Sequence, residues 1–374
     1  MHLIKMHRLF VNKHRYISEG ELMELNAFVQ LLPGASSSQV LTLIGYKRGG
    51  VFLGALTLLI WILPACFLMT LLSFLLQYIS LTESTANLFR YIQPMAVGFL
   101  AFSAYRSFRL FIKHKATFFI MLGASIVTIF IKSPWVFPFL IIGGSVVSNF
   151  SDKRIPETES NPSPIKWGNL WGFVLIFAVA GLISEVARIN NWEMRKPINL
   201  FENFYRFGSL VFGGGGVLIP MMFEQYVIRA KTQYLSPQDF LTGAGMVQAF
   251  PGPVFSIAAF VGGMVLKDMG PDYQLLGCFI GSVAIFLPSL LLVVFFYPIW
   301  NKLKKHVTVF RAMEGINAVA VGIMSAAAIL LFFSISTPFE WHSVMALLAT
   351  FLLLEFSKIP SPLIVLAFLL MGLI

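Results

Sequence analysis

The sequence predicts an all-α, polytopic membrane protein built from two inverted-topology repeats, each with a helical hairpin that is broken at a Pro-Gly pair. Three observations lead to this prediction: the apolar composition, one motif that occurs twice at a fixed spacing, and the placement of cations in the two halves. Of the 374 residues, 57% are hydrophobic and only 12% are charged. Soluble domains carry about 25% charged residues, so an ordinary soluble protein is excluded.

Apolar runs long enough to cross about 30 Å of hydrocarbon recur along the chain. Pairs of shorter apolar runs lie between and after them. The long runs cover residues 51–76, 88–105, 170–187, 275–297 and 315–333. We therefore expect a multi-pass protein surrounded by the lipid bilayer.

The formal net charge of +10 indicates basic loops on the cytoplasmic side, where Lys and Arg gather in membrane proteins. These cations lie in short runs between apolar segments, so we expect no nucleic-acid partner. Cys66 and Cys278 lie in apolar runs and are predicted to be packing residues rather than a disulfide. The histidines lack the spacing of zinc ligands, and the usual hydrolase and metalloprotease signatures are missing. We expect no metal, no cofactor and no enzymatic activity.

A Pro-Gly pair occurs twice within apolar sequence, at Pro33-Gly34 and at Pro251-Gly252, a spacing of 218 residues (251 − 33). Broken backbone inside a lipid-embedded segment must be buried in protein or line a water-filled cavity. A break that recurs at corresponding positions of two halves points to the binding site of a transporter. A kink that serves packing alone is the alternative.

The repeat extends beyond the two pairs. Ser18 and Ser236 precede them at the same spacing, and each is followed three residues later by an acid, as in a capping box. Beyond the second hairpin the spacing becomes 224 residues, so that Pro64 corresponds to Pro288 (288 − 64).

We expect three parts along the chain: a first membrane repeat over residues 1–148, a polar linker over 149–168 and a second membrane repeat over 169–374. The linker is polar, mixed in charge and rich in proline, which suits a solvated connector. Each repeat ends in a pair of short apolar runs.

The two halves carry their cations at opposite ends of equivalent apolar runs. In the first half the basic segment, residues 106–115, follows the run, whereas in the second half residues 302–311 precede it. If basic loops are cytoplasmic, the halves lie in opposite orientations, as in the inverted repeats of many secondary transporters. Arg229 and Lys231 fit this scheme less well, and a parallel duplication with scattered charges is the alternative.

A helix that begins after the first Pro-Gly pair presents free backbone N–H groups to whatever occupies the break, and such a site favours an anion. Ser36, Ser37 and Ser38 add hydroxyl donors there, and Gln39 adds an amide. This set suits a tetrahedral oxyanion. Helix capping is the alternative role of the serines.

The second break keeps its Pro-Gly pair but retains only Ser256 among the corresponding hydroxyls. Gln30 and Gln248 stand at matched positions in apolar surroundings, and polar groups in membrane spans usually face the bundle interior. They are candidates for contact with the substrate, with interhelical hydrogen bonding as the alternative.

Four consecutive glycines, residues 213–216, allow the backbone to approach a ligand or a neighbouring helix closely. They lack the Lys and Ser/Thr of a phosphate loop, so no nucleotide site is expected. Glu24 and Glu224 are the candidates for proton coupling, with ordinary loop or interface charges as the alternative. The predicted substrate-binding residues are Gln30, Pro33, Gly34, Ser36, Ser37, Ser38, Gln39, Gly213, Gly214, Gly215, Gln248, Pro251, Gly252 and Ser256.

The segments that carry these residues resemble the signatures of the chromate ion transporter family, in its long-chain, two-repeat form. In the first half the resemblance lies in residues 30–39 (QLLPGASSSQ) and 44–50 (IGYKRGG). In the second half it lies in residues 207–222 (FGSLVFGGGGVLIPMM) and 248–253 (QAFPGP), so that it covers nearly the whole chain. The resemblance implies an inner-membrane carrier that exports chromate, a dianion shaped like sulfate.

The sequence departs from the family pattern at two places. Ala35 occupies a position where the family usually has a second Pro. The family's first half also opens with its own glycine-rich segment, whose position by the repeat spacing would precede Met1. We therefore expect the first repeat to lack its opening glycine-rich segment.

The sequence thus predicts a secondary transporter that exports chromate and lies, multi-pass, in the cytoplasmic (inner) membrane. The residues support an oxyanion site in general and only the resemblance indicates chromate, so a carrier of sulfate or another oxyanion is the nearest alternative. A membrane-embedded enzyme, which would need a nucleophile–base pair or a metal cluster in the spans, and a membrane remnant without transport are the others. The expected partners are chromate or a sulfate-like oxyanion and the bilayer, with homodimer formation left open.

Overall fold

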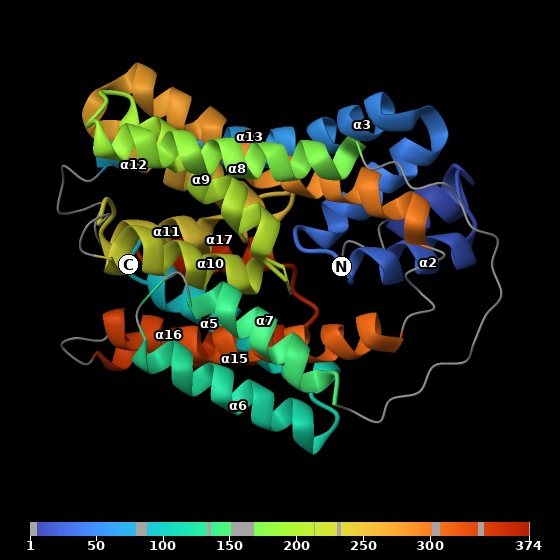
Figure 1. The fold of residues 1–374 in the computed structure, drawn as a ribbon. Helices are drawn as coiled ribbons and strands as arrows, with labels where there is room; N and C mark the ends of the chain where they lie inside the picture. The colour runs from blue at the N-terminus through green and yellow to red at the C-terminus, as the bar shows by residue number, and fades with distance from the viewer. Residues whose placement is uncertain are drawn as a thin grey trace.

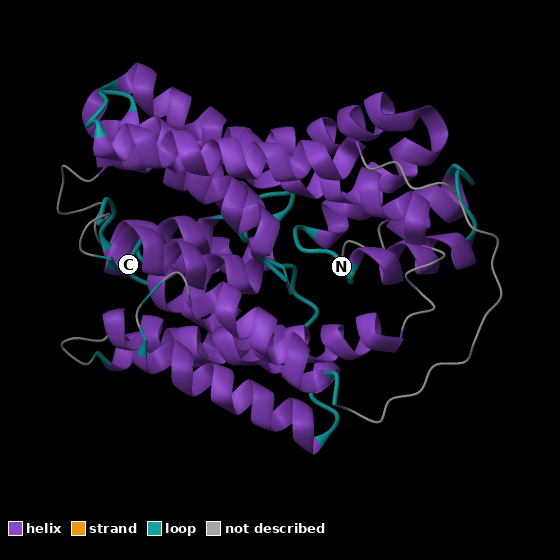
Figure 2. Cartoon of the chain, in the orientation of Figure 1, coloured by secondary structure: helices purple, strands orange, loops and turns teal. Residues whose placement is uncertain are grey.

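The computed structural model describes residues 6–79, 88–131, 133, 136–150, 168–212, 214–229, 233–300, 307–335 and 340–373. Every regular element within these ranges is a helix, as Figure 2 shows. The predicted all-α fold class is therefore confirmed. Most of the predicted linker, residues 149–168, lies outside the described residues.

The helices fall on both sides of that linker, and η marks a short π- or 3-10 helix. Those of the first half are η1 (His7–Lys13), α2 (Glu19–Val29), α3 (Ser36–Ile79), α5 (Ile92–Phe111), α6 (Lys115–Phe130) and α7 (Val136–Ser148). The backbone of α3 is kinked and non-helical at Gly49 and Gly50. Those of the second half begin with α8 (Gly168–Ile189), α9 (Arg195–Leu210), α10 (Gly215–Phe223), η2 (Glu224–Ile228), α11 (Pro237–Met246), η4 (Val254–Ser256) and α12 (Ile257–Leu266). They continue with η5 (Lys267–Met269), α13 (Pro271–Phe296), η6 (Tyr297–Ile299), α15 (Val307–Ile335), α16 (Trp341–Phe356) and α17 (Ser361–Met371).

Several helices have the length and composition of membrane spans. Within the described ranges, four segments qualify: Ser36–Leu76, Trp171–Ile189, Pro271–Ile299 and Thr308–Ile335. Their outer faces carry large exposed apolar side chains, such as Phe52 on α3, whereas Met69 of the same helix is buried. Exposed apolar surface of this extent marks contact with lipid. The chain is a multi-pass membrane protein.

One predicted boundary is wrong. The span expected over residues 88–105 is α5, which begins at Ile92 and continues to Phe111. Arg106 and Arg109, expected in a basic loop, therefore lie on a helix. The segment from 103 to 111 holds no Gly or Pro that would end the helix, and good helix formers surround its cations.

Both predicted hairpins are broken at their Pro-Gly pairs. Residues 30–35 separate α2 from α3, and residues 247–253 separate α11 from η4. The prolines cannot continue a helix, and Gly34 and Gly252 have φ angles of +119° and +147°. Side chains rarely adopt this backbone conformation, so glycine is needed at both positions.

Each break packs against the long helix of the other half. A Cβ atom at Gly34 would meet the side chain of Ser289 on α13, and a Cβ atom at Gly252 would meet Ala65 on α3. Ala65 and Ser289 each follow the matched proline of their helix, and they are 224 residues apart (289 − 65). The two halves therefore exchange equivalent contacts, as two subunits do across a two-fold axis.

A second pair of equivalent contacts is also exchanged between the two halves. Gly98 on α5 and Gly322 on α15 are equivalent by the repeat spacing. A Cβ atom at Gly98 would lie 2.9 Å from the carbonyl oxygen of Leu347 on α16, and one at Gly322 would lie 2.9 Å from the Cβ of Ala124 on α6. Thus α5 packs closely on α16, the helix after α15, and α15 packs closely on α6, the helix after α5.

Figure 1 shows how the helices are layered. α3, α8, α12 and α13 run along one side of the molecule, and α5, α6, α15 and α16 along the other, with α10 and α11 between the two groups. Buried side chains from both groups and from the central helices form one continuous apolar core. A second apolar cluster packs α2 and the start of α3 against the end of α13, where the rings of Phe28 and Trp300 lie 5.1 Å apart.

Candidate functional site

A cavity of about 540 Å³ lies where the two breaks approach the glycine segment, and we call it the hairpin cavity. It brings together three of the predicted binding residues, Ser36, Gly215 and Gln248. Three polar residues of α5 that were not predicted complete its polar surface: Ser103, Arg106 and Ser107. The remaining lining residues are Ala96, Phe99, Leu100, Gly216, Ile219, Val254 and Met324.

Two helices begin at the hairpin cavity. Ser36 is the first residue of α3, and Gly215 is the first residue of α10. The first N–H groups of a helix have no acceptor within it, and the aligned peptide dipoles give this end a partial positive charge. Gly214, the N-cap of α10, has a φ angle of +81° and provides no side-chain cap. Both helix ends are therefore able to donate hydrogen bonds to an anion.

Arg106 supplies the charge of the cavity. It is the only charged residue among the described residues that line it, and no carboxylate lies there to repel an anion. Its side chain is exposed and forms no hydrogen bond or ion pair within the described ranges. A guanidinium group offers several N–H donors in a planar fork that fits the oxygens of an oxyanion.

The glycine segment holds both breaks in place. The N–H of Gly34 donates to the carbonyl oxygen of Val211, just before that segment, at 2.7 Å. A Cβ atom at Gly215 would lie 2.7 Å from the Cβ of Val254, just after the second break. Glycine at this position is therefore required by close packing, which was the alternative role. Gly213 lies outside the described residues.

A second set of polar residues is buried beside the breaks. Ser38 and Ser256 are equivalent by the repeat spacing, and both are 0% exposed. Within the described part of the chain, neither hydroxyl has a hydrogen-bond partner, and the same holds for the hydroxyl of Ser289. The Nε2 of Gln39 donates to the carbonyl oxygen of Pro33 at 2.6 Å, which leaves its Oε1 without a partner.

Such unpaired groups are unusual in protein interiors. A buried polar atom without a hydrogen bond costs about 1–3 kcal/mol, so each one calls for an explanation such as a bound ion or water. Here two of them, the hydroxyls of Ser38 and Ser256, occupy equivalent places in the two halves. Donor groups therefore line both breaks as well as the cavity.

Several of the other predicted binding residues do not line the hairpin cavity. Gln30 is exposed at the end of α2, although its counterpart Gln248 lines the cavity. Ser37 is half-buried and Pro251 is exposed, and neither lines the hairpin cavity. Gly252 packs against α3.

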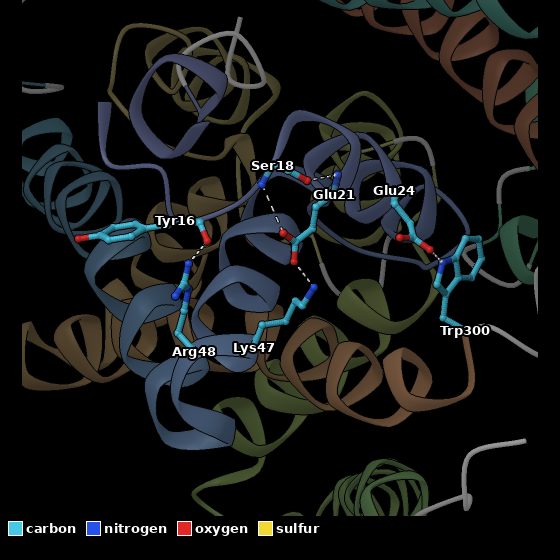
Figure 3. Close-up of polar contacts among 7 residues, drawn as sticks. All are labelled: Tyr16, Ser18, Glu21, Glu24, Lys47, Arg48 and Trp300. Carbon is cyan, nitrogen blue, oxygen red and sulfur yellow. Dashed lines mark hydrogen bonds and ion pairs between the residues drawn. The ribbon is translucent and has the colours of Figure 1, made fainter. Parts of the chain in front are cut away.

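The polar contacts around the first hairpin are structural, as Figure 3 shows. Ser18 and Glu21 form the predicted capping box at the start of α2. Glu21 also pairs with Lys47, and Arg48 donates to the carbonyl oxygen of Tyr16. The basic pair that follows the first hairpin therefore ties α3 back to the segment before α2.

The two candidate coupling acids lie apart from the hairpin cavity. Glu24 is exposed on α2, and its Oε1 accepts a hydrogen bond from the Nε1 of Trp300 at 3.2 Å (Figure 3). Glu224 is half-buried where α10 passes into η2. It lines a separate cavity of about 240 Å³, which we call the apolar cavity because its other walls include Phe223, Leu330 and Leu331.

Sequence reasoning missed the residues of α5. Their spacing did hold a signal: Phe99, Ser103, Arg106 and Ser107 recur at three- and four-residue intervals, as on one face of a helix. The apolar stripe of α5 thus continues as a polar one. Reading residues 106–115 only as a topological loop concealed this pattern.

Comparison with known proteins bears on this geometry. The family model described as "Chromate transporter" matches residues 1–148 and 198–373. The chain is 26% identical over 376 residues to a "Chromate transport protein" of Cupriavidus metallidurans, covering 99% of this chain and 86% of that protein. It is 24% identical to an uncharacterized transporter of Methanocaldococcus jannaschii (97% and 87% covered) and 23% identical to a "Chromate transport protein" of Pseudomonas aeruginosa (87% and 74%). No solved structure matches the chain.

Proposed function

Because this chain belongs to the chromate transporter family, and is a transporter rather than an enzyme, we propose that it exports chromate across the cytoplasmic (inner) membrane as a secondary transporter. The observation that carries the proposal is the hairpin cavity. It joins one arginine, three serine hydroxyls, an amide and two helix N-termini, and no acid among the described residues faces it. All of these groups can donate hydrogen bonds to a tetrahedral dianion.

The substrate binds first in the hairpin cavity. Arg106 pairs with two of its oxygens, while Ser36, Gln248 and the N–H groups of α3 and α10 bind the others. A water takes about 30 Å³ in the liquid, so the cavity holds an oxyanion together with part of its hydration shell. Since these donors recognise charge and shape, sulfate should compete, and a carrier of sulfate or another oxyanion is the second candidate.

The buried donors then replace water along the breaks. Ser38 and Ser256 lie beside them, one in each half, and their hydroxyls gain an acceptor when the anion passes. The Nε2 of Gln39 donates to the anion only by leaving the carbonyl oxygen of Pro33, because its unpaired Oε1 is an acceptor. Broken helices whose N-termini face an anionic substrate are typical of secondary transporters. Glu224 is the better candidate for a coupled proton, because it is half-buried in an apolar cavity while Glu24 is exposed.

The exchanged contacts also support a proposal for the architecture in the membrane. We assign the two repeats to residues 1–148 and 169–374, with the linker over 149–168 between them and opposite orientations in the bilayer. The pairing of each break with the other half's long helix supports this assignment, because inverted repeats meet across a pseudo-two-fold axis.

Single cysteines test the orientation. Val51→Cys and Asp268→Cys lie at exposed positions just after the first and second hairpins, in a chain whose buried Cys66 and Cys278 are replaced by Ala. A membrane-impermeant maleimide should label them from opposite sides of the membrane. Labelling of both from the same side would contradict the inverted repeat and leave the transport assignment standing.

Chromate flux tests the function. Inverted membrane vesicles that contain this chain should take up radiolabelled chromate saturably, and excess sulfate should compete. Replacement of Ser36, Ser37 and Ser38 by Ala should lower uptake, because the hydroxyls beside the first break are lost. Uptake of sulfate with no uptake of chromate would favour the second candidate. If a folded and inserted chain moves neither anion, the proposal fails.

A further inference from the structure

A second polar cavity, of about 570 Å³, lies between α8, α9 and η2, and we call it the α8–α9 cavity. Its walls carry five cations and two acids, a formal surplus of three positive charges. The cations are Arg188, Arg195, Lys196, Arg206 and Arg229, and the acids are Glu185 and Glu202. No step of the proposed transport uses these residues.

Much of this charge is not neutralised within the described residues. Glu185 pairs with Arg188, and Glu202 with Arg206. The other three cations have no ion pair in the described ranges: Arg195 donates to the Oδ1 of Asn191 at 2.7 Å, and Lys196 lies 5.4 Å from the ring centre of Tyr234. The cavity therefore attracts an anionic group.

The inner wall of the cavity carries two buried polar side chains. Arg206 is only 6% exposed, so a guanidinium group is held inside the protein, where burial of a charge is costly. Beside it, Tyr226 is 1% exposed, and its hydroxyl has no hydrogen-bond partner within the described residues. A buried hydroxyl donor next to buried and exposed cations matches the needs of a phosphate oxygen.

The same two helices carry an apolar groove. It has a volume of about 410 Å³ and is lined only by Leu, Ile, Val, Ala and Phe of α8 and α9. Neighbouring residues line the groove and the cavity: Ile183 and Ser184 on α8, and Ile198 and Asn199 on α9. A hydrogen bond from the hydroxyl of Ser184 to the Oδ1 of Asn199 joins the helices at this border.

We propose that α8 and α9 bind an anionic phospholipid, with the phosphate in the α8–α9 cavity and an acyl chain in the adjoining groove. The charge surplus selects an anionic headgroup over a zwitterionic one, and the groove selects a lipid over a free oxyanion. Basic pockets between membrane helices bind lipid headgroups by the same physics. The inference goes beyond the transport proposal and does not depend on which ion is carried.

Native mass spectrometry of the full-length chain in detergent tests the proposal. Phosphatidylglycerol should remain bound about tenfold more than phosphatidylcholine, because each Lys or Arg near the phosphate strengthens binding. Arg195→Gln with Lys196→Gln should remove most of this preference. Lys113→Gln with Lys115→Gln is the matched control, since it removes two exposed cations that lie outside the cavity, and it should leave the preference intact.

Two further variants identify the ligand. Ala180→Trp fills the groove and leaves every charge in place, so it should weaken binding of phosphatidylglycerol about as much as the double charge variant does. Tyr226→Phe removes one hydroxyl and keeps the packing, and should weaken binding by a smaller factor. Equal retention of the two lipids, or no effect of Arg195→Gln with Lys196→Gln, would overturn the proposal. Displacement of the lipid by inorganic phosphate with no effect of Ala180→Trp would overturn it too, in favour of a free-anion site.

Discussion

The hairpin cavity and the apolar cavity are lined by equivalent turns of two long helices. Three of the residues with which each long helix lines its cavity stand at positions related by the repeat spacing. On α5 they are Ser103, Arg106 and Ser107, and on α15 they are Ala327, Leu330 and Leu331. These three equivalent positions thus carry one cation and two hydroxyls in the first half, and three apolar side chains in the second half.

The difference shows which features of a duplicated fold are structural. The close contacts of Gly98 with α16 and of Gly322 with α6 are kept in both halves, because they determine the packing. The glycines of both breaks are kept for their backbone conformation. The lining of the cavities has no such requirement, and at these positions only the first half carries a cation and hydroxyls. The charged and polar lining residues of α5 are therefore where the two halves differ most clearly.

The largest effect is expected when Arg106 of the first half is replaced by leucine, the residue at the equivalent position of the second half, Leu330. Arg106→Leu should lower chromate uptake by about 100-fold, since a charge-assisted hydrogen bond contributes about 1.5–3 kcal/mol and each 1.4 kcal/mol is a factor of ten. The measurement is the initial rate of uptake into inverted vesicles. Arg109→Leu removes a cation one turn away that does not line the cavity, and it should transport normally. Uptake by Arg106→Leu at the wild-type rate would remove Arg106 from the site.

The second test concerns the features that the halves share. Gly34→Ala and Gly252→Ala should each destabilise the protein by about 1–3 kcal/mol, because alanine is strained at these φ angles. Both should lower the midpoint of thermal unfolding in detergent. Adding Ser289→Ala to Gly34→Ala should recover part of the loss, as the clash with that hydroxyl disappears and the strain remains. Full recovery would show that the clash alone requires glycine.

These contrasts explain which parts of the fold and of the candidate site could be predicted from the sequence. The apolar runs, the Pro-Gly breaks and the repeat predicted an all-helical membrane fold, because such features are local and periodic. Ser36, Gly215 and Gln248 were predicted for the site and do line one cavity. Gln30 was predicted by symmetry with Gln248, yet it is exposed, because the repeat spacing preserves position in the chain and not burial.

The missed residues depend on contacts between distant segments. Ser289 became part of the polar set beside Gly34 only because α13 of the second half packs on the first break. Its counterpart, Ala65, carries no polar group, so the repeat gave no reason to select it. Arg106 was assigned to a loop by its charge, which is the strongest local signal for a loop in a membrane protein.

A smaller effect is expected where the halves agree in polarity. Ser38→Ala and Ser256→Ala should each lower chromate uptake by about fivefold and the double variant by about 30-fold, as each hydroxyl contributes about 1 kcal/mol to binding. Stability should stay the same or rise, because in the absence of substrate these buried hydroxyls have no partner within the described residues and each substitution removes an unpaired polar atom. Ser209→Ala is the contrasting control: its hydroxyl donates to the carbonyl oxygen of Tyr205, so it should cost stability and leave uptake unchanged. A loss of stability without a loss of uptake in the Ser38 and Ser256 variants would assign them to packing.

The smallest effect should come from the apolar cavity. If that cavity carries the coupled proton, Glu224→Gln should remove the stimulation of chromate uptake by an imposed pH gradient, while uptake without a gradient falls by only about threefold, a change of less than 1 kcal/mol in the barrier. The substitution keeps the size of the side chain and removes its charge, so the cavity walls should stay as they are. Glu24→Gln alters the other candidate acid, which is exposed on α2, and should leave the gradient dependence intact. If Glu224→Gln keeps the full response to the gradient while Glu24→Gln loses it, coupling belongs to α2, the first arm of the first hairpin. The first repeat would then handle both the anion and the proton.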